Sequence, residues 1–211
     1  MLLHDYFRSS AAYRVRIALN LKGLAADRRF VHLRRGEQRE AAFLAVNPPG
    51  LVPVLEDGAL VVAQSLAILE YLEERVPEPA LLPPAAGDRA WVRSVALAIA
   101  CDIHPLNHLR VLRDREERLG ADAAARDAWY RHWIAEGFAA LEPQLAARAT
   151  GRFCLGDRPT FADVCLVPQV ANANRFRVPL DAFPRIRAID ASCLALGAFD
   201  LARPERQPDA E

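Results

Sequence analysis

Two adjacent serines, Ser9 and Ser10, stand where a short apolar strand that begins at Leu2 gives way to a helix. Apolar residues at helical spacing over residues 15–21, followed by Gly23, indicate this helix and its end. A helix N-terminus presents unpaired N–H groups and the positive end of the peptide dipoles, so it stabilises a nearby anion such as a thiolate. Because the stretch contains no cysteine, thiol chemistry there requires a sulfur carried by a ligand. An ordinary N-cap is the alternative, and the serine pair alone leaves both interpretations open.

A second polar pair, Gln64 and Ser65, precedes an amphipathic run and predicts another helix with Ser65 as its N-cap. The positive end of this helix suits a carboxylate. Pro53 lies inside the preceding apolar stretch, so that strand has an exposed edge there or the Val52–Pro53 bond is cis. Free N–H and C=O groups at such an edge pair with extended peptide ligands, and an edge-protecting proline is the equal alternative.

The elements that carry these residues predict a small α/β domain over residues 1–80. Their order is strand, helix, strand, helix, strand, strand, helix, with the second strand at residues 28–33 and a short helix at 41–46. A right-handed crossover makes the first two strands parallel neighbours. Asp57-Gly58 predicts a hairpin turn between the last two strands, so the expected sheet is mixed.

The rest of the chain predicts an all-helical domain over residues 88–211, after a linker with four prolines at residues 76–87. Helical patterns cover residues 88–119, 122–148, 160–174 and 184–196. Thr160 and Asp163 fit a capping box. The polar tail after Pro204 is expected to be loose.

The composition argues against several classes of partner. The 211 residues carry 27 basic and 27 acidic side chains, and a net charge of zero gives no electrostatic support for binding nucleic acid or an anionic membrane. No apolar run approaches the roughly 20 residues that a membrane-spanning helix needs. The four cysteines lack CxxC spacing and the N-terminus lacks a basic-then-apolar leader, so we expect a cytoplasmic protein.

Five motifs follow one another in a specific order along nearly the whole chain. They are Ser9-Ser10 with YRVRIAL at 13–19, NPPGLVPVLEDG at 47–58, Gln64-Ser65 with Ala67-Ile68, Ile103-His104-Pro105, and FADVCLVPQVANANRF at 161–176. In this combination the sequence resembles the zeta class of glutathione transferases, and more narrowly the bacterial maleylpyruvate and maleylacetoacetate isomerases. The resemblance implies a thioredoxin-like first domain that holds glutathione, a helical second domain, and a homodimer.

The resemblance also implies roles for individual residues. Ser9 or Ser10 would donate to the glutathione thiolate. Apart from the resemblance, we expect Arg8, at the mouth of the same junction, to act in catalysis as a cation that faces the developing enolate charge. Val52, before a cis Pro53, would pair its backbone with the cysteinyl unit of glutathione. Further contacts to the tripeptide would come from Gln38, Gln64, Ser65, His104 and His108, with Gln64 and Ser65 on the γ-glutamyl carboxylate.

The implied reaction is cis-trans isomerisation of a maleyl oxo-acid to its fumaryl form, with glutathione as cofactor. Addition of a thiolate to the double bond leaves a single bond that rotates, and elimination restores the thiolate. The substrate is a small dicarboxylate, and arginine forks match carboxylates, so Arg8, Arg110 and Arg175 are the candidate substrate-binding residues. Zeta enzymes often have a cysteine after the serine pair, where this chain has Ala11. The cysteine therefore cannot be required for the mechanism assigned here.

Three other interpretations stay open. A conjugating glutathione transferase would use the same glutathione site for a broad range of electrophiles. The second interpretation is a non-catalytic interaction domain of the same fold. The retained Ser9-Ser10 and Gln64-Ser65 motifs argue against it. The third is a metal site from Cys101, His104 and His108, which lie at helical spacings, although Pro105 separates the histidines.

Overall fold

A four-stranded mixed sheet organises the first part of the chain in the computed structural model, which describes residues 1–148 and 150–211. The strands are β1 (Leu2–Asp5), β2 (Asp27–Phe30), β3 (Val54–Asp57) and β4 (Leu60–Ala63), in the order β2-β1-β3-β4. β1 pairs in parallel with β2 and antiparallel with β3, and β3 and β4 form a hairpin. The predicted parallel crossover and hairpin are therefore confirmed.

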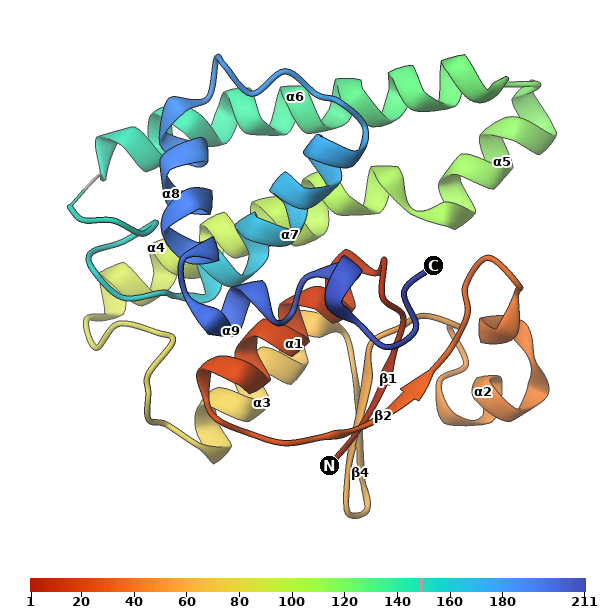
Figure 1. Cartoon of the computed structure of the whole chain (residues 1–211), viewed down its shortest axis with the longest axis horizontal. Helices are drawn as coiled ribbons and strands as arrows, with labels where there is room; N and C mark the ends of the chain where they lie inside the picture. Colours follow the sequence, from red (N-terminus) through yellow and green to blue (C-terminus); the bar gives the residue numbers. More distant parts are fainter. Residues whose placement is uncertain (149) are drawn as a thin grey trace. The chain divides into compact units, whose positions relative to one another are not determined.

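Three helices complete this fold: α1 (Ser10–Leu21), α2 (Ala41–Val46) and α3 (Ser65–Arg75). α1 ends before Gly23, whose φ of +64° is a left-handed conformation that glycine adopts without strain. α1 and α3 lie side by side (Figure 1). A short 3₁₀ turn, η1 (Glu37–Arg39), leads into α2.

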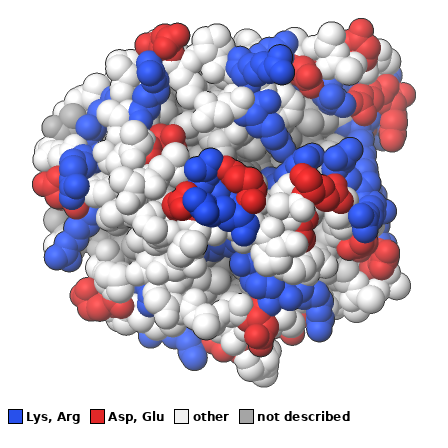
Figure 2. Space-filling view, viewed as in Figure 1, with Lys and Arg blue, Asp and Glu red and all other residues white. Residues whose placement is uncertain are grey.

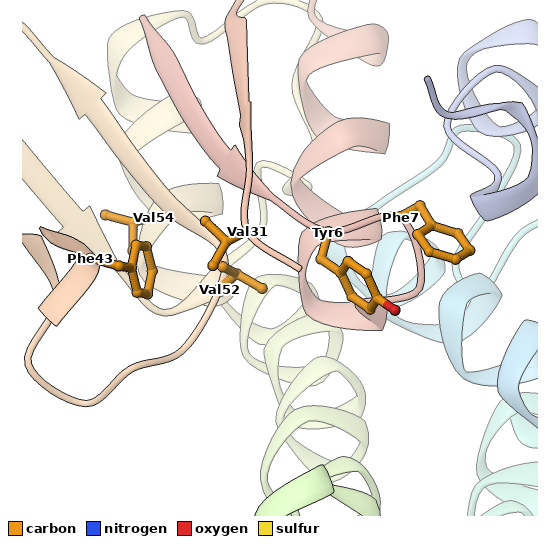
Figure 3. Close-up of a cluster of buried hydrophobic side chains, with 6 residues drawn as sticks. All are labelled: Tyr6, Phe7, Val31, Phe43, Val52 and Val54. Carbon is orange, nitrogen blue, oxygen red and sulfur yellow. The ribbon is translucent and has the colours of Figure 1, made fainter. Parts of the chain in front are cut away.

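Apolar side chains of β3, of α2 and of the segments that flank the strands form one buried cluster (Figure 3). Its members are Tyr6, Phe7, Val31, Phe43, Val52 and Val54. The cluster joins the loop after β1 to the segment before β3, which are far apart in the sequence. It therefore fixes two of the predicted binding segments against the same core.

The second part of the chain is helical and buries apolar side chains such as Ile134, Phe138 and Val164. The helices of this part are α4 (Ala86–Leu97), the π-helix η2 (Ala98–Ile103), the 3₁₀ helix η3 (His104–Asn107), α5 (Leu109–Leu119), α6 (Ala123–Ala147), α7 (Phe161–Arg175) and α8 (Pro184–Leu194). The capping box of Thr160 and Asp163 is present at the start of α7, as predicted. The single helix predicted over 88–119 is wrong. Pro105 lacks an N–H and interrupts the helical hydrogen bonds, so the chain passes through η2 and η3 before α5.

Contacts divide the chain into two compact units, Met1–Ala80 with Leu194–Glu211, and Leu81–Cys193. The last residues had been predicted to belong to the helical domain at 88–211, but they pack with the first unit. They form α9 (Gly197–Asp200) and η4 (Pro204–Arg206), and α9 contacts α1. The prediction of a loose tail after Pro204 is thus wrong, because Gln207 accepts from the half-buried Arg28 and Asp209 accepts from the buried backbone N–H of Phe7.

The surface charges are mixed in sign. On the face shown in Figure 2, basic and acidic side chains are interspersed and no broad area of one sign forms. Within the described parts of the chain, no helix combines the length and apolar character that crossing a membrane requires.

Candidate functional site

The junction between β1 and α1 places Ser9 at the helix N-cap. Its φ of −69° and ψ of 112° are extended, and its Oγ accepts a hydrogen bond from the Ala12 N–H at 3.2 Å. This bond uses a lone pair of the hydroxyl, so the O–H remains able to donate to an anion. Capping and thiolate binding are therefore compatible roles for one serine. Ser10 is the first residue of α1 and is only 6% exposed, whereas Ser9 is half-buried, so Ser9 is the more accessible donor.

Arg8 lies beside this serine and is half-buried. Its guanidinium carbon is 5.0 Å from the centre of the Phe7 ring, which orients the side chain by a cation–π contact. Within residues 1–148 and 150–211 no carboxylate forms an ion pair with Arg8. Its charge is thus available for an anionic ligand.

The start of α3 differs by one residue from the prediction. Gln64 occupies the N-cap position and Ser65 is the first helical residue. The Ser65 Oγ accepts from Arg14 Nη1 at 3.2 Å, and both side chains are buried, so α1 and α3 are tied together near their N-termini. Gln64 has a φ of +73°, which costs a non-glycine residue about 1–3 kcal/mol and is found mainly at functional sites. Its own side chain is exposed.

The segment before β3 contains a cis bond between Val52 and Pro53. The sequence predicted that Pro53 lies inside a strand. In the structure β3 starts only at Val54, so Pro53 lies just before the strand. The Asn47 side chain donates to the Leu51 carbonyl at 2.7 Å and holds this segment in place.

Gly50 allows this segment to approach η1. Its φ is +65°, and a Cβ there would lie 2.8 Å from the backbone oxygen of Gln38. The Gln38 side chain is 8% exposed, and its Oε1 is buried without a hydrogen bond from any residue the structure describes. Buried acceptors are normally satisfied, so a donor from a ligand fits this atom.

The predicted contacts from the second unit cluster around η3. The rings of His104 and His108 lie with their centres 4.5 Å apart. Trp129 of α6 donates from Nε1 to the Leu106 carbonyl at 2.8 Å, and so fixes η3 against α6. Asn107, between the histidines, is 6% exposed.

The two candidate arginines of this unit have different surroundings. Arg110, on α5, is exposed. Arg175 is also exposed, but its Nη2 donates to the Tyr130 hydroxyl at 3.2 Å and its guanidinium lies 4.8 Å from the Phe176 ring centre. Burial raises the pKa of Tyr130, so this hydroxyl stays protonated at neutral pH. Arg175 is therefore held in a defined position by Tyr130 and Phe176.

A metal site built from Cys101, His104 and His108 was one alternative from the sequence. No group of three or more His, Cys, Asp or Glu side chains that could hold a metal ion occurs in the described portion of the chain. Cys101 is exposed and the other three cysteines are buried, all as free thiols.

Sequence reasoning missed the buried charges beneath the junction. Arg14 and Arg16 are 1% and 2% exposed although both lie on α1. Arg16 Nη1 pairs with Asp5 at 2.8 Å, and burial lowers its pKa to about 10, so it stays charged at neutral pH. The sequence did contain a signal for these charges, because two arginines lie on the apolar face of a helix that is otherwise buried. Arginines in such a position require partners inside the protein.

Two family models match this chain. Residues 8–75 match the glutathione S-transferase N-terminal domain, and residues 123–189 match the glutathione S-transferase C-terminal domain.

Similar proteins cover the full length. The chain is 50% identical to a probable maleylacetoacetate isomerase of Vibrio cholerae, covering 100% of this chain and 98% of that one, and 49% identical to a maleylpyruvate isomerase of a Ralstonia species, covering 100% of both. A holo structure of maleyl pyruvate isomerase, described as a bacterial zeta-class glutathione S-transferase, superposes with a TM-score of 0.98 at 49% identity over 100% of both chains. The maleylacetoacetate isomerase of Methylobacterium extorquens, solved with bound malonate and glutathione, superposes with a TM-score of 0.97 at 41% identity over 100% of both chains.

Proposed function

The chain belongs to the glutathione S-transferase family, and we propose that it is a glutathione-dependent cis-trans isomerase that converts maleylpyruvate or maleylacetoacetate to its fumaryl isomer. The relatives reported above share its full length and carry these activities in their names. The structural observation that supports the proposal is Ser9, whose accessible hydroxyl stands at the N-terminus of α1 while the stretch lacks a cysteine. The fold is that of a glutathione transferase, with a thioredoxin-like sheet followed by helices.

The residues of the first unit fit glutathione. The N–H groups at the start of α3, with Gln64 and Ser65, suit the γ-glutamyl carboxylate. The backbone of Val52 would pair with the cysteinyl unit, and the buried Oε1 of Gln38 would accept from the tripeptide. When bound, glutathione supplies the thiolate whose reversible addition lets the substrate double bond rotate. His104 and His108 remain proposed contacts from the second unit.

The protein is proposed to contribute to the reaction by stabilising negative charge. Ser9 donates its O–H toward the thiolate position, and the dipoles of α1 favour negative charge there. Arg8 offers a cation beside the same position, where charge develops on the keto side of the substrate. Arg175 and Arg110 are proposed to bind the substrate carboxylates. Ser10 is the second candidate donor to the thiolate, and because it is buried in the first turn of α1, Ser9 is the proposed donor.

The substrate class follows from the same chemistry. Two carboxylates on a small acid match two or more guanidinium groups. The Methylobacterium relative holds malonate, a dicarboxylate, together with glutathione. We therefore assign a small maleyl dicarboxylate as the substrate.

A homodimer in the cytoplasm is the proposed form of the protein. β4 lies at the edge of the sheet and exposes Leu60 and Val61, which are 42% and 49% exposed. Such an apolar edge suits a second copy of the chain. Four free thiols are consistent with a reducing compartment. Sedimentation of the purified protein as a monomer at micromolar concentration would contradict the dimer.

The function is tested by following maleylpyruvate and maleylacetoacetate spectrophotometrically, each with and without glutathione. We expect turnover of at least one acid that depends on glutathione at catalytic concentration. Conjugation of an aromatic electrophile without any isomerisation would instead assign a general glutathione transferase. Absence of glutathione binding in calorimetry would assign a non-catalytic member of the family.

A further inference from the structure

Charged side chains hold the backbone of the loop between β1 and α1. Tyr6 and Phe7 open this loop at the end of β1 (Figure 3). The Tyr6 N–H donates to Asp5 Oδ1 at 2.8 Å, and the Phe7 carbonyl accepts from Arg16 Nη2 at 3.0 Å. The Tyr6 carbonyl accepts from the Ser9 N–H at 2.9 Å. Three of the four backbone polar groups of Tyr6 and Phe7 are thus bound by neighbours in the sequence.

The fourth group is bound by the other end of the chain. The Phe7 N–H donates to Asp209 Oδ2 at 2.9 Å, across 202 positions of sequence. Phe7 is 4% exposed, so this N–H lies in a buried environment where an unsatisfied donor is costly. The donor of this bond, Phe7, directly precedes Arg8 and lies two residues before Ser9.

Asp209 also balances the charge beneath the loop. Arg16 and Arg28 both contact the carboxylate of Asp5, which leaves one positive charge in excess. The Asp209 carboxylate raises the pKa of both arginines, against the lowering caused by their burial. Asp209 therefore acts on both guanidinium groups through the field of its carboxylate, although among the described ion pairs it contacts neither of them.

The C-terminal segment is shaped to present this carboxylate. The Gln207 amide nitrogen donates to the carbonyls of Leu201 at 2.9 Å and Arg203 at 2.7 Å, and its oxygen accepts from Arg28 Nη2 at 3.1 Å. The Ala202 carbonyl accepts from Arg16 Nε at 2.9 Å. Arg16 thus binds both the tail and the loop, while Arg28 binds the tail and Asp5 at the end of β1.

We propose that Asp209 is a positioning residue for the isomerase site, which holds Arg8 and Ser9 in place through the Phe7 N–H. The inference rests on the function proposed above. Reacting groups lose about 100-fold in rate when they are misplaced by about 1 Å, and the hydrogen bond constrains the backbone that carries both side chains. Asp209 touches no substrate atom in this role.

The test compares Asp209→Ala with Asp209→Asn in the full-length protein. The asparagine oxygen can still accept from the Phe7 N–H, whereas alanine cannot. Glu205→Ala is the matched control, because Glu205 is on the same tail and pairs only with Arg203 among the described ion pairs. Four quantities are measured: kcat, KM for glutathione, the ultraviolet thiolate titration of bound glutathione, and hydrogen exchange of the Phe7 amide.

We expect Asp209→Ala to lower kcat about tenfold or more and to lower the thiolate fraction at neutral pH, with KM for glutathione changed less than threefold. Exchange of the Phe7 amide should accelerate. Asp209→Asn should restore kcat and amide protection to within about threefold, because the acceptor is kept. Glu205→Ala should match the unmodified protein in all four quantities.

The proposal fails if Asp209→Ala keeps its kcat and thiolate titration while the Phe7 amide loses protection. It also fails if the asparagine variant loses as much activity as the alanine variant, which would assign the effect to charge alone. Should the alanine variant not fold, Asp209→Glu decides, since it keeps the charge but displaces the acceptor: reduced thiolate supports the proposal and an unchanged titration overturns it. Lack of isomerase activity in the unmodified protein would instead refute the proposed function.

Discussion

Replacing Ser9 by glycine removes its hydroxyl but keeps most of the helix-capping preference of this position. Glycine costs only about a few tenths of a kcal/mol at an N-cap, whereas alanine costs about 1 kcal/mol. The bond at stake is the 3.2 Å contact from the Ala12 N–H to the Ser9 Oγ. We therefore expect Ser9→Ala to lower Tm by about 2–4 °C in a chain of this size, and Ser9→Gly to lower it by about 1 °C.

Catalytic activity should depend on the presence of the Ser9 hydroxyl and not on how well residue 9 caps the helix. A hydrogen bond to a charged group contributes about 1.5–3 kcal/mol, and about 1.4 kcal/mol corresponds to one pKa unit. Loss of the Ser9 donor should therefore raise the pKa of the bound thiol by about 1–2 and reduce the thiolate at neutral pH by up to about 10- to 100-fold. Both variants should lose kcat/KM by this factor, despite their different stability.

The assay combines glutathione-dependent isomerisation, thiolate titration and thermal unfolding for Ser9→Ala, Ser9→Gly and the control Ser10→Ala. Ser10 is buried in the first turn, so its replacement should leave the thiol titration unchanged. If Ser9→Gly retains full turnover while Ser10→Ala loses it, the assignment of the donor to Ser9 is refuted. If activity follows Tm across the three variants, the hydroxyl acts only as a helix cap.

The other predictions concern different parts of the chain. Arg8→Ala should reduce kcat by about tenfold or more with little change in the glutathione Kd, whereas Ser65→Ala should mainly weaken glutathione binding measured by calorimetry. An equal loss of kcat and of glutathione affinity in both variants would contradict this division of roles. Gly50→Ala should lower the free energy of unfolding by more than about 1 kcal/mol in denaturant titration, because its φ is positive and its Cβ would meet the Gln38 carbonyl; a neutral effect would disprove the close approach. A thiol reagent should modify Cys101 rapidly and the other three cysteines only after unfolding, and rapid reaction of more than one thiol in the native protein would contradict their burial.

Much of the fold was predictable because local patterns encode local structure. The Asp57-Gly58 turn signal predicted the β3–β4 hairpin, and the Thr160 capping box predicted the start of α7. The same reasoning failed around Pro105, where apolar periodicity continues through a segment whose hydrogen bonds are interrupted. It also misplaced the cap of α3 by one residue, because a serine is preferred there and the strained backbone of Gln64 has no signal in the sequence.

The motifs of the sequence indicated the class of protein by resemblance. The sequence by itself determined the order of the helices and strands, and the polar residues at helix starts that suit an anionic ligand. These features depend on residue types at short spacing, which act through local backbone preferences. Only the tertiary structure decided which distant groups meet: Arg14 with Ser65, Arg16 with Asp5, and Asp209 with the Phe7 N–H. The physical reason is that a buried charge or N–H requires a partner but does not specify where in the chain that partner lies.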